Sequence, residues 1–370
     1  MREDLKYWIG FNMVPGIGPK RFEALLKHFG SAGEAWQATP ADLQAAGLDT
    51  RSLQSLLTMR SQLDLDAELE RNAKADVTVL TWDDPGYPPL LKQIYDPPYV
   101  LYVRGELLPA DEWAIAVVGT RRASAYGREA ARRLAGDLAM NGVTIVSGLA
   151  QGIDSHAHKI ALEAGGRTIA VLAHGLDQVY PPQNRSLAAK IVEQGALVSE
   201  FALGTRPEAK NFPARNRIIS GLSLGTLVVE AGKRSGALIT AEFAAEQGRE
   251  VFAVPGNIFA AGAAGTNQLI QSGAKVALSV EDILEELNLT MLGAFQQARE
   301  IVPENEMESR LLEHLSDDPI HIDELGRAAG VPISEVSSTL ALMELKGMVR
   351  QVGGMNYVVA RESRADYHTE

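Results

Sequence analysis

The chain has 370 residues, of which 46% are hydrophobic and 22% charged, and a formal net charge of -12. This length and composition are typical of a soluble globular protein with two or three domains, and the absence of cysteine excludes disulfides and thiolate metal sites. It shows neither a signal peptide nor a run of the ~18 apolar residues that a membrane span needs, so we expect a cytoplasmic protein that does not cross a membrane.

Residues 1–75 predict a small helical domain, because apolar residues recur at spacings of three and four between Gly and Pro breaks. Within it, VPGIGPKRFEALLKHFG (14–30) has the pattern of a helix-hairpin-helix module, in which glycines let backbone N–H groups at a helix start approach a phosphate. A Gly-bounded turn between two packed helices explains the same residues, and both interpretations stay open.

Residues 76–112 form a Pro-rich connector with two strand-like runs, 77–82 and 99–105, in which apolar and polar positions alternate. The connector is too apolar for an exposed linker. We therefore expect it to pack on the domain that follows.

Residues 113–285 predict a doubly wound α/β domain with a parallel sheet. Near-continuous apolar runs, typical of parallel strands buried on both faces, alternate with helical stretches such as 127–142 and 155–166. The expected strands are 114–119, 143–148, 167–175, 196–200, 225–230, 250–256 and 275–278. Ligands of such sheets bind outside the carboxyl ends of the strands.

Charge is distributed unevenly along the chain. Residues 113–280 carry 17 Lys and Arg against 12 Asp and Glu, a balance of +5, whereas residues 1–112 and 281–370 have balances of -6 and -11. A basic central segment between acidic flanks is compatible with a polyanionic partner, even though the chain as a whole is acidic.

Residues 286–303 predict a linker, and residues 304–360 predict a winged-helix-like domain. Three helical stretches (308–316, 321–330 and 332–349) precede a two-stranded hairpin around Gly353 and Gly354. Because the third helix carries only Lys346 as a cation, we do not expect it to read duplex DNA in the major groove and favour a protein-contact or regulatory role. Residues 361–370 predict a frayed tail.

Four of the expected strand ends open into Gly-containing turns. Glycines let phosphates reach backbone amides, and hydroxyls and helix N-termini add hydrogen-bond donors. We therefore expect one phosphate-binding crevice, formed by Gly119, Thr120, Arg121, Arg122 and Ser124; by Ser147, Gly148, Gly152 and Asp154; by Gly175, Asp177, Tyr180 and Asn184; and by Glu230, Gly232, Lys233, Ser235, Gly236 and Thr240. Because neither a dinucleotide-binding nor a P-loop fingerprint occurs, we expect no cofactor.

Three arginines are candidates for contact with an anionic, flat ligand: Arg121, Arg215 and Arg217. Arginine offers planar bidentate donors to phosphate, and its flat face, like that of Phe212, can stack on a nucleobase. The alternative for these arginines is an internal ion-pair lattice with Glu200 and Glu230.

Candidate catalytic groups are few. His156 and His158 lie near Asp154, but their spacing puts them on different faces of a helix. We expect no metal site there, with His156 bonded within the fold and His158 near the surface. Glu230 can serve as a general base or can hold backbone amides or an arginine, and we favour the structural role. No serine-hydrolase elbow occurs.

Six segments closely resemble the DprA family of DNA-processing proteins, whose members are also called Smf: 87–105, 117–127, 147–191, 212–223, 228–256 and 265–275. The resemblance implies an extended Rossmann-like core, flanked by an N-terminal helical domain of the sterile-alpha-motif (SAM-like) type and a C-terminal winged-helix domain. It further implies a homodimeric single-stranded-DNA-binding protein that protects incoming DNA and loads the RecA recombinase in natural transformation and DNA recombination. No enzymatic activity, cofactor or metal is implied.

Two sets of residues follow from the resemblance and from the Gly-containing turns. The single-stranded-DNA site comprises Gly119, Arg121, Arg122, Ser147, Gly148, Phe212, Arg215, Asn216, Arg217 and Lys233. The dimer face implied by the family comprises Asn267, Ile270 and Val276. A basic groove with flat groups is what sequence-independent binding of a single strand needs, and dimerisation would add avidity.

A second interpretation is an enzyme that acts on a nucleotide. The segment GLSLGTLVVE (221–230) faintly resembles the P-G-G-x-G-T-x-x-E loop of Rossmann-like nucleoside-monophosphate N-glycoside hydrolases, with Glu230 as the catalytic group. Leu222 and Ser223 stand where that loop has glycine-rich sequence, which impairs the phosphate cradle.

Overall fold

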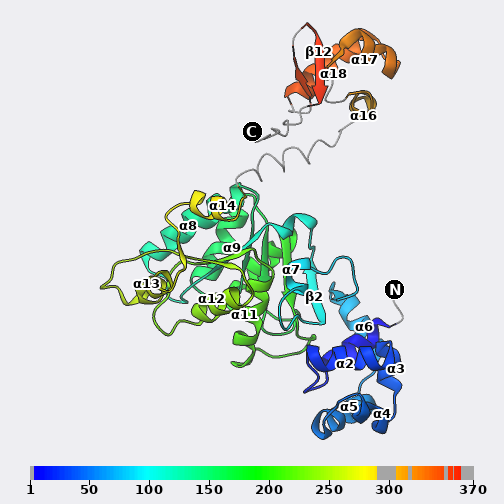
Figure 1. Ribbon diagram of the computed structural model, residues 1–370, viewed down its shortest axis with the longest axis vertical. Coiled ribbons are helices and arrows are strands. Elements are labelled where there is room, and N and C mark those ends of the chain that lie inside the picture. Colours follow the sequence, from blue (N-terminus) through cyan, green and yellow to red (C-terminus); the bar gives the residue numbers. More distant parts are fainter. Residues whose placement is uncertain (1–3, 290–305, 316–318, 346–348, 353, 360–370) are drawn as a thin grey trace, which may run out of the picture. The chain divides into compact units, whose positions relative to one another are not determined.

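The computed structural model describes residues 4–289, 306–315, 319–345, 349–352 and 354–359. The chain forms two compact units, Met1–Thr290 and Met291–Glu370, and each is described by itself (Figure 1). The tail predicted at 361–370 lies outside the described residues, and so does most of the linker predicted at 286–303. Within the described part of the chain, no helix is long and apolar enough to cross a membrane.

Short helices form the N-terminal part of the first unit, as the sequence predicts. They are α1 (Leu5–Asn12), α2 (Pro19–Phe29), α3 (Ala32–Gln37), α4 (Pro40–Ala45), α5 (Thr50–Gln62) and α6 (Leu65–Lys74). Side-chain oxygens of Ser31, Thr39, Asp49 and Asp64 accept from backbone N–H groups at the starts of α3 to α6, which stabilises these short elements. Phe22 of α2 stacks on Tyr99 of the connector with ring centroids 4.2 Å apart, so these helices are packed on the core.

A nine-stranded sheet forms the centre of the first unit. Its strands are β1 (Thr78–Thr81), β2 (Val100–Gly105), β3 (Ala114–Val118), β4 (Thr144–Ser147), β5 (Thr168–Val171), β6 (Gly195–Ser199), β7 (Gly225–Val228), β8 (Glu250–Ala253) and β9 (Lys275–Val276). The order is β1-β2-β6-β5-β4-β3-β7-β8-β9, and the part from β6 to β9 is parallel. The predicted doubly wound parallel sheet is confirmed.

The Pro-rich connector contributes β1, β2 and the short helix α7 (Pro89–Lys92). β2 pairs antiparallel with both β1 and β6, so the connector extends the parallel sheet by an antiparallel edge. The Trp82 indole N–H and the Tyr87 hydroxyl both donate to the Pro98 carbonyl, at 3.1 and 2.6 Å. These bonds satisfy polar groups that the apolar, Pro-rich segment would otherwise bury unpaired.

Helices cover both faces of the sheet. They are α8 (Ala125–Met140), α9 (Ile153–Glu163), α10 (Arg185–Gln194), α11 (Asn211–Gly221), α12 (Gly236–Glu246), α13 (Ala264–Gln271) and α14 (Glu281–Glu286). α8, α9 and α10 pack in a row, whereas α11 and α12 pack together on the face formed by Ala116, Val118 and Val146. After β6 the chain returns to place β7 beside β3, so the winding direction reverses between these two strands. Such a switch point leaves a crevice outside the carboxyl ends of the strands.

The second unit contains the helices and the hairpin that the sequence predicts. Its elements are α16 (Glu306–Leu312), β10 (Ile320–His321), α17 (Ile322–Ala329), α18 (Ile333–Leu345), β11 (Val349–Gln351) and β12 (Asn356–Val359), with strand order β10-β12-β11. Leu311, Leu325, Val336, Leu340 and Met343 form its core. Gly353 and Lys346 lie outside the described residues.

Candidate nucleic-acid interface

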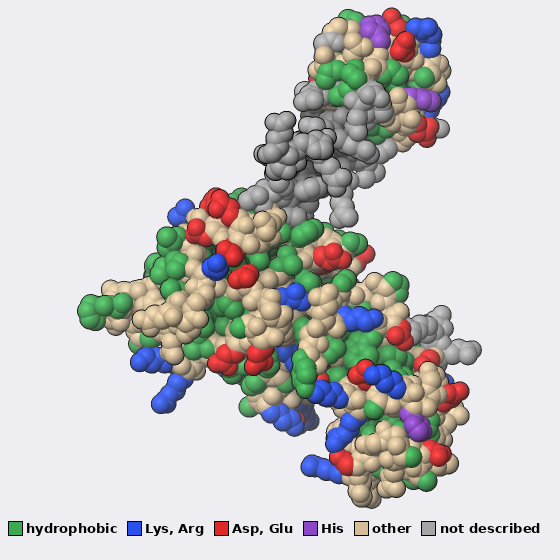
Figure 2. All heavy atoms as spheres, viewed as in Figure 1, with side chains coloured by type: hydrophobic (Ala, Val, Ile, Leu, Met, Phe, Trp, Pro, Cys, Tyr) green, Lys and Arg blue, Asp and Glu red, His purple; other side chains and the backbone are tan. Residues whose placement is uncertain are grey.

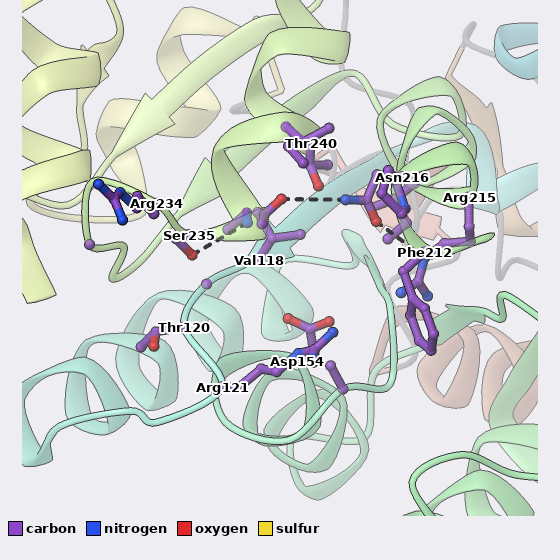
Figure 3. Close-up of a pocket in the computed structure, with 18 of the residues that line it drawn as sticks. Val118, Thr120, Arg121, Asp154, Phe212, Arg215, Asn216, Arg234, Ser235 and Thr240 are labelled. Atoms are coloured by element: carbon purple, nitrogen blue, oxygen red, sulfur yellow. Dashed lines mark hydrogen bonds between the residues drawn. The ribbon is translucent and has the colours of Figure 1, made fainter. Parts of the chain in front are cut away.

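An open cleft of about 800 Å³ lies at the switch point between β3 and β7. All four Gly-containing turns contribute to it, as expected for strand ends that meet at one edge of a sheet. The lining residues include Gly119, Thr120, Arg121, Asp154, Tyr180, Phe212, Arg215, Asn216, Gly232, Lys233, Arg234, Ser235 and Thr240. In Figure 3, Arg234 and Phe212 mark opposite ends of the cleft, with Arg121 and Asp154 between them.

Exposed cations dominate the polar lining of the cleft. Arg121, Lys233 and Arg234 are exposed and line it, and in the described part of the chain none of the three forms an ion pair with a carboxylate. Their donors are therefore available to an anion from solution, and guanidinium groups suit phosphate because they can bind it through two parallel hydrogen bonds.

Two aromatic rings stand at the opposite end. The Phe212 ring meets the Tyr180 ring edge-on, with centroids 5.8 Å apart. The Arg121 and Arg215 guanidinium carbons lie 5.7 and 5.9 Å from the Phe212 centroid. Tyr180 is 46% exposed. Flat groups beside unpaired cations can hold a ligand that combines bases with phosphates.

Arg215 is part of the cleft wall. Its side chain is buried, and its Nη1 donates to the carbonyl oxygens of Gly148, at 2.9 Å, and Val171. Burial lowers the pKa of Arg215 to about 10, an effect that nearby Asp154 opposes, so the guanidinium is charged at neutral pH. It lies only 2.7 Å from where a Cβ on Gly148 would be. Arg215 therefore joins the ends of β4 and β5 and requires a glycine at position 148.

The structure does not bring Arg217 to the cleft. Its Nη1 and Nη2 donate to the two carboxylate oxygens of Glu200, at 2.6 and 2.7 Å, and its Nε donates to the Asp96 carbonyl at 2.9 Å. The sequence left open a DNA contact or an ion pair with Glu200 or Glu230. The structure shows the ion pair with Glu200, and Glu230 takes no part in it.

The other residues assigned to the DNA site lie in the cleft lining, just outside it, or buried behind it. Gly119, Asn216 and Lys233 line the cleft. Arg122 is exposed just outside the lining. The Ser147 hydroxyl is fully buried and donates to the Val117 carbonyl at 2.6 Å, and Gly148 lies behind the Arg215 guanidinium.

Glu230 holds the turn after β3 in place. Its Oε2 accepts from the Ser124 backbone N–H at 2.9 Å, and its carbonyl accepts from the Thr120 N–H at 2.7 Å. A Cβ on Gly127 or Gly262 would lie 2.0 or 2.5 Å from its carboxylate oxygens, so these glycines enclose the carboxylate. Of the roles considered for Glu230, the structure shows the bonding of backbone amides, and its side chain does not line the cleft.

The expectation for the two histidines is wrong, because their environments are reversed. His158 is fully buried and its Nδ1 lies 2.6 Å from the Thr168 Oγ1, while His156 is half-buried at a groove between α9 and α10. Since the Thr168 hydroxyl donates to the Ile145 carbonyl, the His158 Nδ1 must carry the proton. Burial, aided by the charge of Arg215, lowers the pKa of His158 to about 3. No cluster of potential metal ligands occurs in the described ranges.

The residues assigned to a dimer face lie at the far edge of the sheet. Val276, on the edge strand β9, is 40% exposed, and Ile270 is half-buried on α13. The Asn267 side chain is bonded within the fold: it donates to the Gly256 carbonyl at 3.0 Å and accepts from the Gly256 N–H at 3.1 Å.

Among the cations and aromatic rings that line the cleft, the assigned DNA site omitted Arg234 and Tyr180, although Tyr180 was expected in the phosphate-binding crevice. Arg234 follows Lys233 in the same turn, and Tyr180 precedes two prolines at the end of another of the four turns. In both cases the sequence indicated the residue, because it adjoins a motif that was assigned to the site. A cation or an aromatic ring beside an assigned glycine turn is a sufficient reason to include it.

Comparisons with known proteins agree with the fold. Residues 78–288 match the family described as DNA recombination-mediator protein A, and residues 296–355 match the DprA winged helix domain, which confirms the winged-helix prediction. Protein Smf from Synechocystis sp. is 36% identical, in an alignment that covers 95% of this chain and 98% of the relative.

Solved structures of relatives are similar to this chain as well. The X-ray structure of DNA processing protein A from Streptococcus pneumoniae matches with a TM-score of 0.66 and 36% identity, over 76% of this chain and 97% of that one. DNA processing protein A from Helicobacter pylori, described for its single-stranded-DNA binding mode, matches with a TM-score of 0.52 and 30% identity, over 57% of this chain and 95% of that one.

Proposed function

The chain belongs to the DprA/Smf family of DNA-processing proteins, and from this membership we propose that it binds single-stranded DNA in the cleft between β3 and β7. One observation carries the proposal: the cleft combines exposed, unpaired cations (Arg121, Lys233 and Arg234) with the rings of Phe212 and Tyr180. Proteins that bind single strands without sequence preference use a positive groove for the backbone and flat groups for the bases.

The proposal extends to the fate of the bound strand. The protein protects incoming single-stranded DNA and loads the RecA recombinase onto it during natural transformation and recombination in the cytoplasm. It acts as a homodimer, in which two clefts on one strand gain avidity, and the exposed Val276 on edge strand β9 supports a contact there. We propose no enzymatic activity for it. The Glu230 carboxylate accepts from the Ser124 N–H and is not part of the cleft lining, which counts against the alternative of a hydrolase with Glu230 as its catalytic group.

Fluorescence anisotropy with a labelled oligo-dT of about 35 nucleotides, and with duplex of the same length, tests the DNA-binding proposal. Wild-type protein should prefer the single strand. Arg121→Gln should weaken binding to any sequence alike and should reduce the slope of log affinity against log salt by about 0.7, the value for one lost phosphate contact on a single strand.

The matched control is Arg132→Gln, which removes an exposed arginine of α8 that is paired with Glu129 and does not line the cleft. It should leave both the affinity and the salt slope unchanged. Equal, weak binding of single strand and duplex that Arg121→Gln does not alter would contradict the proposal.

A further inference from the structure

Two strongly exposed aromatic rings of the α/β domain (residues 113–285) lie outside the cleft lining. Phe259 is 90% exposed and Tyr126 is 57% exposed, and Ile258, beside Phe259, is 80% exposed. Phe259 lies on the loop between β8 and α13, and Tyr126 lies in the first turn of α8. A single exposed apolar residue is ordinary, but these two rings share one loop and have cations around them.

The loop 255–260 has a defined conformation that presents Phe259 to solvent. The Asn267 side chain bonds both the N–H and the carbonyl of Gly256. The Phe259 N–H donates to the Asn257 Oδ1 at 2.9 Å, and the Tyr126 hydroxyl donates to the Pro255 carbonyl at 2.8 Å. The Tyr126 ring is thus bonded to the loop, and the backbone that carries the Phe259 ring is held in place. Groups that are already positioned lose less conformational entropy when a base stacks on them.

The same loop lies against the cationic end of the cleft. The Gly265 N–H donates to the Ala231 carbonyl at 2.7 Å, and a Cβ on Gly232 would lie 3.2 Å from the Ala261 carbonyl oxygen. The chain that follows Phe259 therefore packs on the turn that carries Lys233 and Arg234.

Tyr126 approaches the loop from the other wall of the cleft. It follows Arg121 and Arg122 in the chain. Figure 2 shows hydrophobic side chains projecting at the end of the core where Figure 1 labels α13, with Lys and Arg side chains close below them. In the described part of the chain, Arg122, Lys233 and Arg234 form no ion pair with a carboxylate.

We propose that a bound single strand leaves the cleft over loop 255–260, where its bases stack on Phe259 and Tyr126 and its phosphates meet Arg122 and Arg234. This inference rests on the proposed function and extends its site. Unpaired cations around the rings favour a polyanion with flat groups. An apolar partner surface would have to bury these charges without counter-ions.

Affinity measured against strand length tests the inference. Oligo-dT from about 6 to about 30 nucleotides should bind wild type with increasing affinity until the path is filled. Phe259→Ser and Tyr126→Ser should each lose about tenfold in affinity for the long strands, the value of one stacked base, and nothing for the shortest. Phe259→Trp should bind like wild type. Abasic sites in the part of the oligonucleotide that lies outside the cleft should lower the affinity of the wild-type protein. The same abasic sites should lower the affinity of Phe259→Ser much less.

Met140→Ser is the matched control, because Met140 is 67% exposed at the other end of α8, about 20 Å from Tyr126. If wild type binds no single strand, the proposed function fails, and this inference with it. If Arg121→Gln weakens binding but both serine variants keep wild-type affinity at every length, only this inference is overturned. It is also overturned if Phe259→Ser lowers the oligomeric mass in sedimentation and the loss of affinity is no greater than the loss of oligomer explains. The loop would then be an interface between copies of the chain.

Discussion

Replacing Arg217 by glutamine tests whether this arginine supports the fold or contacts DNA. Arg217 and Glu200 form a bidentate ion pair whose side chains are only 10% and 17% exposed. The Arg217 Nε donates to the Asp96 carbonyl as well. Glutamine can replace neither the charge nor this set of bonds, so the substitution leaves the Glu200 carboxylate largely buried without its counter-ion.

Removal of one partner from a buried ion pair costs about 3–5 kcal/mol of unfolding free energy, because the remaining charge is uncompensated. Glu200 keeps some contact with solvent, so we expect the lower end of that range, about 3 kcal/mol. The double variant Arg217→Met/Glu200→Leu should be more stable than Arg217→Gln, since it removes both charges and restores apolar packing.

Denaturant unfolding followed by tryptophan fluorescence reports on the first unit, Met1–Thr290, alone. All four tryptophans lie within it: Trp8, Trp36, Trp82 and Trp113. Under conditions where the variant stays folded, its affinity for oligo-dT and its salt slope should equal those of wild type. A wild-type unfolding midpoint combined with a weaker affinity and a lower salt slope would refute the assignment of Arg217 to the fold.

Two further substitutions test whether Arg215 and His158 stabilise the fold. Arg215→Gln should lower the unfolding free energy by about 2–3 kcal/mol, because it removes charged hydrogen bonds to the Gly148 and Val171 carbonyls, and it should change the salt slope less than Arg121→Gln does; a normal unfolding midpoint would contradict this. The pKa of His158, about 3 in the folded core, lies below that of the unfolded chain, so stability should fall as the pH drops from 6.5 toward 3. His158→Gln should reduce this pH dependence in unfolding measurements between those limits, and an unchanged dependence would contradict the assignment.

The position of the cleft follows from local sequence, because each strand is a short apolar run and each turn after it contains glycine. The directions of the arginines do not. Arg215 and Arg217 read as one basic cluster in the sequence, but they lie in helix α11, where two positions correspond to a rotation of about 200°. One guanidinium therefore faces the ends of β4 and β5, and the other faces Glu200 on the opposite side. Unless the helix α11 is predicted, the sequence does not distinguish the role of Arg215 in the cleft wall from the role of Arg217 in the ion pair with Glu200.

The histidines show the same limit for contacts between distant segments. Spacing places His156 and His158 on different faces of α9, but it does not show which face meets the sheet. The hydroxyl that bonds His158 belongs to Thr168 at the start of β5, and Thr168 in turn donates to Ile145 of β4. Only the pairing of these strands brings the three residues together, so burial could not be assigned from the helix alone.

An acidic chain can present a basic cleft because the carboxylates around this cleft are bonded within the protein. Glu200 pairs with Arg217, Glu230 accepts from the Ser124 N–H, and the buried Asp154 accepts from the Gly148 N–H at 3.2 Å. Glu200 and Glu230 are thereby kept from pairing with the cations of the lining. Burial raises the pKa of Asp154, and the charges of Arg215 and Arg121 beside it oppose that rise. The remaining surplus of acidic residues lies in the flanking segments, and exposed charges are screened over about 8 Å at physiological salt. The local arrangement, and not the net charge of -12, therefore determines what the cleft can bind.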